Sequence, residues 1–99
     1  MPLIEQMANI GSEVGRAAKW LSKDRTELAE GAFLRALDLF DLTLKVGRSS
    51  SPEARYPLLH ELGRARDLFC HSYMTKDFDN LIWLDHYFGD FAAAQRKGL

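Results

Sequence analysis

Six apolar residues near the start of the chain follow one another at steps of four, three, four, three and four, and this spacing constrains the fold most. They are Leu3, Met7, Ile10, Val14, Ala17 and Leu21. Side chains three and four residues apart lie on one face of an α-helix, so the six form a single apolar stripe. The pattern returns in three later segments, and the alternation typical of strands never persists. The chain is therefore predicted to be all-α.

The predicted architecture is an antiparallel up-down-up-down four-helix bundle, formed by one domain over residues 1–99. We expect helices over 3–22, from the polar turn at 22–25 to about Val46, over 57–74 and over 79–95. Short connections after the first and third helices make consecutive helices antiparallel. The later stripes are Ala29, Phe33, Ala36/Leu37, Phe40 and Leu44; Leu58, Leu62, Ala65, Phe69 and Ser72/Tyr73; and Leu81, Leu84, Phe88 and Phe91.

Polar residues, glycines and prolines suggest where these helices begin and end. Asp24, with Glu27 three residues later, resembles a capping box at the start of the second helix, and Gly47 is the expected stop signal at its end. Residues 47–52 are then a loop, with Ser51 able to cap a turn. Because the residue before a proline avoids the helical region, the third helix is expected to begin near Pro57. Asp79 is the expected cap of the fourth, and Gly98 follows its end.

Composition narrows the classes of function. The chain has 99 residues and a net charge of −1, so it has no bulk field that would attract nucleic acid or anionic lipid. It contains no apolar run long enough to span a membrane and no basic region followed by an apolar block, as a secretory signal would have. A single cysteine, Cys70, excludes an internal disulfide. These features predict a cytoplasmic protein.

The sequence gives little support for a metal-binding site or for a reactive thiol. Di-iron bundles carry Glu-x-x-His pairs, which this chain lacks. Asp38 and Asp41 share one helix face and are interpreted as a solvated surface, so neither a metal nor a cofactor is expected. Cys70, beside a stripe residue, is interpreted as a small buried side chain rather than a nucleophile. A small-molecule pocket in the core near Cys70 and Asp41 stays open as a further hypothesis.

The segment from Arg66 to His71 is the most suggestive candidate for chemistry. It resembles the Arg-(four to six residues)-His motif of HEPN domains, small helical bundles that cleave RNA without a metal in toxins and defence proteins. The resemblance implies that Arg66 stabilises phosphate charge, that His71 transfers a proton and that Asp67 is the polar neighbour. On one continuous helix, however, Arg66 and His71 point about 140° apart. The alternative is a surface pair between Asp67 and His71.

A second resemblance covers most of the chain. Residues 11–20, residues 36–44 and residues 62–73 with Tyr87 and Phe88 together resemble a family of short, uncharacterised bacterial proteins. In that family the position of His71 is commonly acidic, which argues against a shared nuclease site. Similar bundles accompany minimal nucleotidyltransferases in toxin–antitoxin pairs, which is an analogy of fold alone.

Residues outside the stripes favour a role in binding proteins. Trp20, Trp83 and Tyr87 are the predicted interface residues, with core packing as the alternative for both tryptophans. Five glycines inside predicted helices indicate either drift or close approach of two helix backbones: Gly11, Gly15, Gly31, Gly63 and Gly89. Arg16, Lys19, Lys23 and Arg25 alternate with acidic residues and are interpreted as a mixed surface rather than a phosphate site.

The favoured hypothesis is a non-enzymatic interaction module, a homodimer or the partner of another protein. The alternative is a HEPN-like ribonuclease or nucleotide-binding bundle that uses Arg66 and His71, and only this alternative implies a nucleic-acid partner.

Overall fold

The chain folds into four helices in the computed structural model, which describes residues 3–50 and 52–96 and the side chains of residues 3–47 and 59–93. The helices are α1 (Leu3–Ser22), α2 (Thr26–Ser50), α3 (Pro52–Thr75) and α4 (Phe78–Arg96), and the described residues form no strand. The prediction of an all-α four-helix bundle is thereby confirmed. The molecule measures 40 × 26 × 20 Å along its principal axes.

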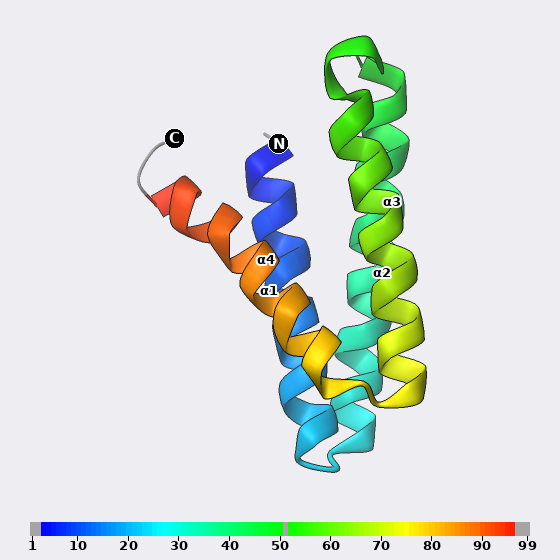
Figure 1. The fold of residues 1–99 in the computed structure, drawn as a ribbon, viewed down its shortest axis with the longest axis vertical. Coiled ribbons are helices and arrows are strands. Elements are labelled where there is room, and N and C mark those ends of the chain that lie inside the picture. The colour runs from blue at the N-terminus through cyan, green and yellow to red at the C-terminus, as the bar shows by residue number, and fades with distance from the viewer. Residues whose placement is uncertain (1–2, 51, 97–99) are drawn as a thin grey trace.

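The helices are arranged around α1 and α2, which form an antiparallel hairpin (Figure 1). Helix α3 runs back along α2, and α4 crosses α1 obliquely instead of lying parallel to it (Figure 1). The most extensive packing joins α1 to α4 and α1 to α2, whereas α3 makes fewer contacts with its two neighbours. Helices α3 and α4 therefore diverge from their shared connection and leave part of α4 uncovered.

Two of the helix glycines explain how closely α1 and α4 approach. A Cβ atom built on Gly11 would lie 2.5 Å from the Cβ of Phe88, and one on Gly15 would lie 2.6 Å from Oδ1 of Asp85. At Gly11 the neighbours are the Cβ and backbone of Phe88, so this position excludes a side chain and close packing inside the bundle is confirmed for it; at Gly15 the neighbour is the end of the Asp85 side chain, which would have to move. An added Cβ on Gly31 would meet only Arg35 of its own helix, and on Gly63 or Gly89 it would meet nothing within 4 Å.

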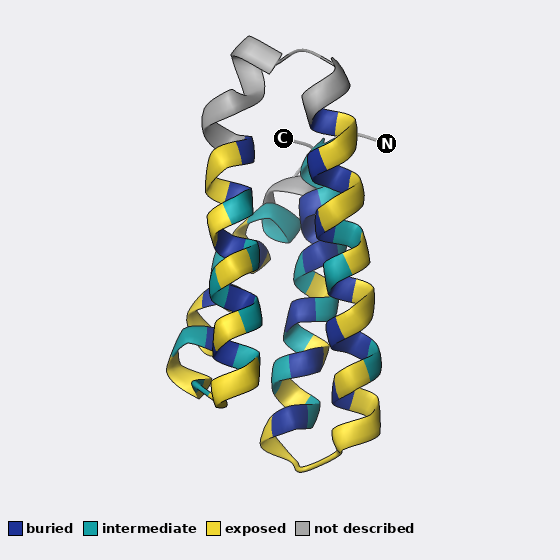
Figure 2. Cartoon of the chain, turned by 90° about the vertical axis from the view of Figure 1, so that its right-hand side faces the viewer, coloured by how far each residue is buried: buried dark blue, intermediate teal, exposed yellow. Residues whose placement is uncertain are grey.

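The core consists mainly of the predicted stripes, which appear as buried bands on the helices (Figure 2), and it also contains Ala8, Ala32 and Leu59, which the stripes did not include. The stripe residues of α1 and α2 are buried except Leu3 and Leu37, which are partly buried like Tyr73 and Phe91. Leu58 lies outside the described side chains. Phenylalanine rings link the helices: the Phe40 centroid lies 5.6 Å from that of Phe88 and 6.0 Å from that of Phe69.

The turn between α1 and α2 corrects the role of Asp24. Its φ angle is 57°, and its N–H donates to the Leu21 carbonyl at 3.2 Å. The N–H of Arg25 donates to the Trp20 carbonyl at 2.9 Å, which completes a Schellman motif with Asp24 in the left-handed position. Asp24 therefore ends α1 and does not cap α2 as predicted. Aspartate tolerates this conformation better than most residues.

The same motif joins α3 to α4. Lys76 has a φ angle of 55°, its N–H donates to the Tyr73 carbonyl at 3.3 Å, and the Asp77 N–H donates to the Ser72 carbonyl at 2.8 Å. Oδ1 of Asp77 then accepts from the Asn80 N–H at 3.2 Å. The prediction that Asp79 caps α4 is wrong, because Asp77 occupies the capping position and Asp79 lies within the first turn.

The loop predicted for residues 47–52 is also largely replaced by helix. Helix α2 continues past Gly47 to Ser50, and α3 begins at Pro52, five residues before the predicted start at Pro57. Gly47 is buried, and a Cβ atom there would lie 2.5 Å from Cδ2 of Leu59. The missing side chain thus lets α3 pack against α2, and this contact outweighs the low helix propensity of glycine. Pro52 is favourable at a first helical position. Ser51 and Gly98 lie outside the described residues.

Candidate functional site

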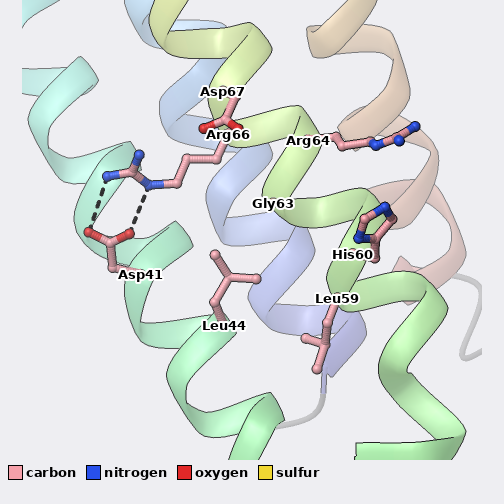
Figure 3. A pocket seen from close by; sticks show the side chains of 8 residues that line it. All are labelled: Asp41, Leu44, Leu59, His60, Gly63, Arg64, Arg66 and Asp67. Atoms are coloured by element: carbon pink, nitrogen blue, oxygen red, sulfur yellow. Dashed lines mark hydrogen bonds and ion pairs between the residues drawn. The ribbon is translucent and has the colours of Figure 1, made fainter.

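Arg66, the proposed phosphate ligand, is bound to a carboxylate on the neighbouring helix. Its Nε lies 2.8 Å from Oδ1 of Asp41, and its Nη2 lies 3.4 Å from Oδ2 (Figure 3). The hydrogen bond to Asp41 raises the pKa of Arg66, and burial opposes it only in part. The two side chains form a forked ion pair that joins α2 to α3. This geometry favours a structural role for Arg66.

His71 and Asp67 do not join this pair. Both are exposed, and the one contact described at His71 is its carbonyl, which accepts from Oγ1 of Thr75 at 2.8 Å. Among the described side chains, no ion pair connects Asp67 to His71. The structure thus brings Arg66 to Asp41, where the HEPN resemblance would require it to act together with His71. The alternative pairing of Asp67 with His71 is not formed either.

Cys70 lies beside the same cluster as a half-buried thiol. Its Sγ is 4.0 Å from Nη1 of Arg66, and it packs against the core. Burial raises its pKa, and the opposing effect of the Arg66 charge is smaller. A thiol with a raised pKa stays protonated near neutral pH and is a weak nucleophile. Cys70 packs against the core, as the sequence predicts, although its side chain is half-buried instead of buried.

The hollow at Asp41 is a surface feature between α2 and α3, with a volume of about 610 Å³. Eight residues line it: Asp41, Leu44, Leu59, His60, Gly63, Arg64, Arg66 and Asp67. Figure 3 shows that Arg64 and His60 extend away from the Arg66–Asp41 pair. Cys70 does not line this hollow, which lies at the surface, so the hollow is not the core pocket hypothesised near Cys70 and Asp41. Polar side chains here do not converge on one point.

A second candidate region is the side of α4 that faces α3. Trp83 is 56% exposed, and its ring stacks on Tyr87 with centroids 5.5 Å apart and planes inclined by 16°. The Tyr87 hydroxyl donates to Oε1 of Glu61 at 2.6 Å. Burial, followed by this hydrogen bond, raises the Tyr87 pKa well above its ordinary value. A groove of about 130 Å³ between α3 and α4 is lined by Glu61, Arg64, Ala65, Leu68, Trp83 and Tyr87.

The other side of α4 carries apolar residues that the sequence did not single out as an interface. Phe78 and Ile82 are 36% and 53% exposed. They border a hollow of about 250 Å³ between α1 and α4, lined by Gly15, Ala18, Lys19, Ser22, Phe78, Leu81, Ile82 and Asp85. Ile82 directly follows the stripe residue Leu81 and so lies one step outside the buried face of α4. An apolar residue at such a position was the sequence feature that could have indicated an exposed apolar side chain here.

Trp20 differs from Trp83 in its surroundings. It is half-buried and packs against the core, while the ammonium groups of Lys19 and Lys23 lie 5.0 and 5.9 Å from its ring centroid. These cation–π contacts hold both lysines on the outer surface of α1. Nearby, Glu13 accepts hydrogen bonds from both Arg16 and Arg35, at 2.7 and 3.1 Å. The surface around Trp20 is thus mixed in charge.

Metal-binding and membrane-spanning features are both missing from the described part of the chain. There, no three His, Cys, Asp or Glu side chains gather in a way that could hold a metal ion. No helix over the same residues has the length and apolarity needed to cross a bilayer. Comparison with known proteins adds no further assignment, since no family model, curated protein or solved structure matches this chain.

Proposed function

We propose that this protein is a non-enzymatic interaction module that binds another protein chain, its own copy or a different one, through α4. The binding region, named here the α4 surface, is the exposed part of α4 that runs from its α1 side, with Phe78 and Ile82, to its α3 side, with Trp83 and Tyr87. The observation that carries the proposal is that three of these large apolar side chains, within six residues of one helix, are between 36% and 56% exposed. The cytoplasm is the compartment we propose for it, where a lone thiol stays reduced.

The composition of the α4 surface supports this role. Tryptophan and tyrosine are among the residues most enriched at the positions that dominate binding energy in protein interfaces. Covering a large apolar side chain completely gives roughly 1.5–3 kcal/mol, so three half-covered ones leave a few kcal/mol available to a partner. Trp83 is held in place by its stacking on Tyr87, which Glu61 fixes in turn. An anchor that is already ordered loses little side-chain entropy on binding.

The ribonuclease alternative has weaker support. Arg66 would have to leave Asp41 to reach a phosphate, and the Asp41 carboxylate would then repel the same phosphate. His71 does not line the hollow that contains Arg66 and Asp67. The interaction module is therefore the function that the geometry supports best.

Hydroxyl-radical footprinting tests the proposal and does not require the partner to be identified. The chain is labelled once in the cells that express it and once as a dilute purified protein. We expect Phe78 and Trp83 to be protected in cells, while Leu34 on α2, 52% exposed, is labelled equally in both samples and serves as the internal reference. Equal labelling of Phe78 and Trp83 in the two samples would exclude the proposal.

A further inference from the structure

We infer that the partner of the α4 surface is a second copy of this chain, docked across the hollow between α1 and α4 so that α1 of each copy lies on α4 of the other. This inference rests on the proposed function and identifies the partner that binds the α4 surface. It is carried by the distribution of charge on the two rims of the hollow, which makes the surface complementary to itself after a twofold rotation.

Two lysines lie at the α1 side of the hollow, within a surface that is otherwise mixed in charge. Lys19 lines the hollow, and Lys23, in the turn that follows α1, holds its ammonium group near the same Trp20 ring. Both lysines are exposed, and neither forms an ion pair among the described residues. Glu13, six residues before Lys19, is ion-paired with Arg16 and Arg35, and exposed Asp24, next to Lys23, forms no ion pair among the described side chains. Lys19 therefore faces the hollow with a charge that none of these ion pairs neutralises.

The α4 rim is acidic. Over residues 78–93, α4 has exposed aspartates at 79, 85 and 90 and neither lysine nor arginine, and of these aspartates Asp85 lines the hollow. Asp85 lines the same hollow as Lys19, yet the two form no ion pair within one chain. Between the rims lie the exposed apolar side chains of Phe78 and Ile82. An apolar centre with a polar rim is a common layout for an interface.

Twofold symmetry selects the arrangement. In an isologous dimer, if residue i of one copy meets residue j of the other, then j also meets i. Packing α4 on α4 would bring aspartates against aspartates, which is unfavourable. Packing α1 on α4 brings Lys19 of each copy to Asp85 of the other and forms the ion pair twice, with the Ile82 side chains in the centre.

Gly89 supplies a separate supporting observation. It follows Ile82 by seven residues, or two helical turns, and so lies on the same side of α4. It is exposed, and a Cβ atom added there would meet nothing within 4 Å among the described residues. Packing inside one chain thus gives no reason for a glycine, which costs about 1 kcal/mol relative to alanine inside a helix. A second copy whose backbone approaches α4 would supply that reason.

Charge reversal in two separate variants provides the decisive test. We expect wild-type protein to sediment as a dimer, and Lys19→Glu and Asp85→Lys each to weaken dimerisation on the order of a hundredfold, because each variant homodimer contains two like-charge contacts. An equimolar mixture of the two variants should form a heterodimer of greater affinity than either variant homodimer, since both of its contacts again join opposite charges. Mass-labelling one variant identifies this heterodimer.

A matched pair of variants tests the apolar centre. Ile82→Glu should also abolish the dimer, whereas Leu34→Glu, at a position of nearly equal exposure on α2, should leave it unchanged. Circular dichroism melting verifies that all variants are folded, which is expected because every altered side chain is exposed. The inference is wrong if wild-type protein stays monomeric at high concentration, or if the charge-reversed variants dimerise as tightly as wild type.

Failure of this inference and failure of the proposed function give different results. A monomeric purified protein whose Phe78 and Trp83 are still protected in cells would replace the second copy by a different protein and leave the proposed function standing. A monomeric protein without protection in cells would contradict both.

Discussion

The α1 backbone at Gly11 lies so close to Phe88 of α4 that a Cβ atom on the glycine would be 2.5 Å from the Cβ of Phe88 and 3.4 Å from its carbonyl carbon. One of these neighbours is backbone, which cannot rotate away. Relief would require the two helices to separate along their whole crossing. The same crossing places Asp85 beside Gly15, so the hollow next to it depends on this contact.

Gly11→Ala is therefore expected to destabilise the fold, by about 1–3 kcal/mol, which is the usual effect of overpacking a core. Gly63→Ala is the matched control, because an added Cβ there would meet nothing within 4 Å and the change should stabilise α3 by about 0.5–1 kcal/mol. Urea denaturation of both variants measures the free energies of unfolding. Equal effects in the two variants would show that α1 and α4 do not approach as described.

Lys76→Gly is expected to stabilise the protein by about 1 kcal/mol, because lysine occupies a left-handed conformation at the end of α3 that glycine adopts without strain. Lys76→Ala keeps the strain and serves as the comparison. Thermal melting followed by circular dichroism should show a higher Tm for the glycine variant alone. A lower Tm for Lys76→Gly would mean that this turn is not strained.

Ser72→Ala is expected to leave the free energy of unfolding unchanged or to raise it by about 1 kcal/mol. The Ser72 hydroxyl is fully buried and has no hydrogen-bond partner among the described residues. An unpaired buried hydroxyl loses its bonds to water without replacing them, so its removal relieves a penalty. A clear loss of stability in chemical denaturation would reveal a polar partner of this hydroxyl in solution.

Stability is expected to fall as the pH rises above about 10, the ordinary pKa of tyrosine. Burial and the hydrogen bond to Glu61 raise the Tyr87 pKa in the folded state. Above the unfolded pKa the folded chain therefore holds more protons than the unfolded chain, and the free energy of unfolding decreases with pH. Below that pH the contribution is fully present. Tm measurements from about pH 8 to 11 should show a smaller decline for Tyr87→Phe than for wild type.

Arg66 and Asp41 are expected to stabilise each other and not to cleave RNA. A double-mutant cycle with Arg66→Ala and Asp41→Ala should give a coupling free energy of about 0.5–1 kcal/mol, as for other partly exposed ion pairs. Mixed RNA incubated with wild-type protein should stay intact. Cleavage that is lost in His71→Ala would instead establish the HEPN-like activity.

Helix identity and the buried faces could be predicted because burial dictates a regular spacing of apolar residues. Phe40, Phe69 and Phe88 are fully buried as expected. Helix ends were less predictable, because they depend on a few local contacts. Gly47 is typical of a stop signal, yet Leu59, twelve residues later, packs where its side chain would be and keeps it inside α2.

The candidate surfaces were predictable only in part. Trp83 stands out in the sequence as a large side chain beside a stripe, and it is exposed. Ile82, which directly follows the stripe residue Leu81, gives a similar but weaker signal, because a single apolar residue beside a stripe does not show by itself whether it is exposed. The ion pair between Arg66 and Asp41 could not be predicted from the sequence either. Asp41 lies 25 residues earlier, and only the packing of α2 beside α3 brings the two side chains together.

Asp77 ends the capping motif of α3 with its N–H and begins α4 with its carboxylate. One residue therefore contributes to the end of α3 and to the start of α4, and no further residue separates the two contacts. These two contacts restrict the direction in which α4 leaves α3, so a partner of α4 meets the helix at an orientation that this turn sets. Inserting a single residue into this turn would change the direction of α4 without changing the amino-acid sequence of the helix.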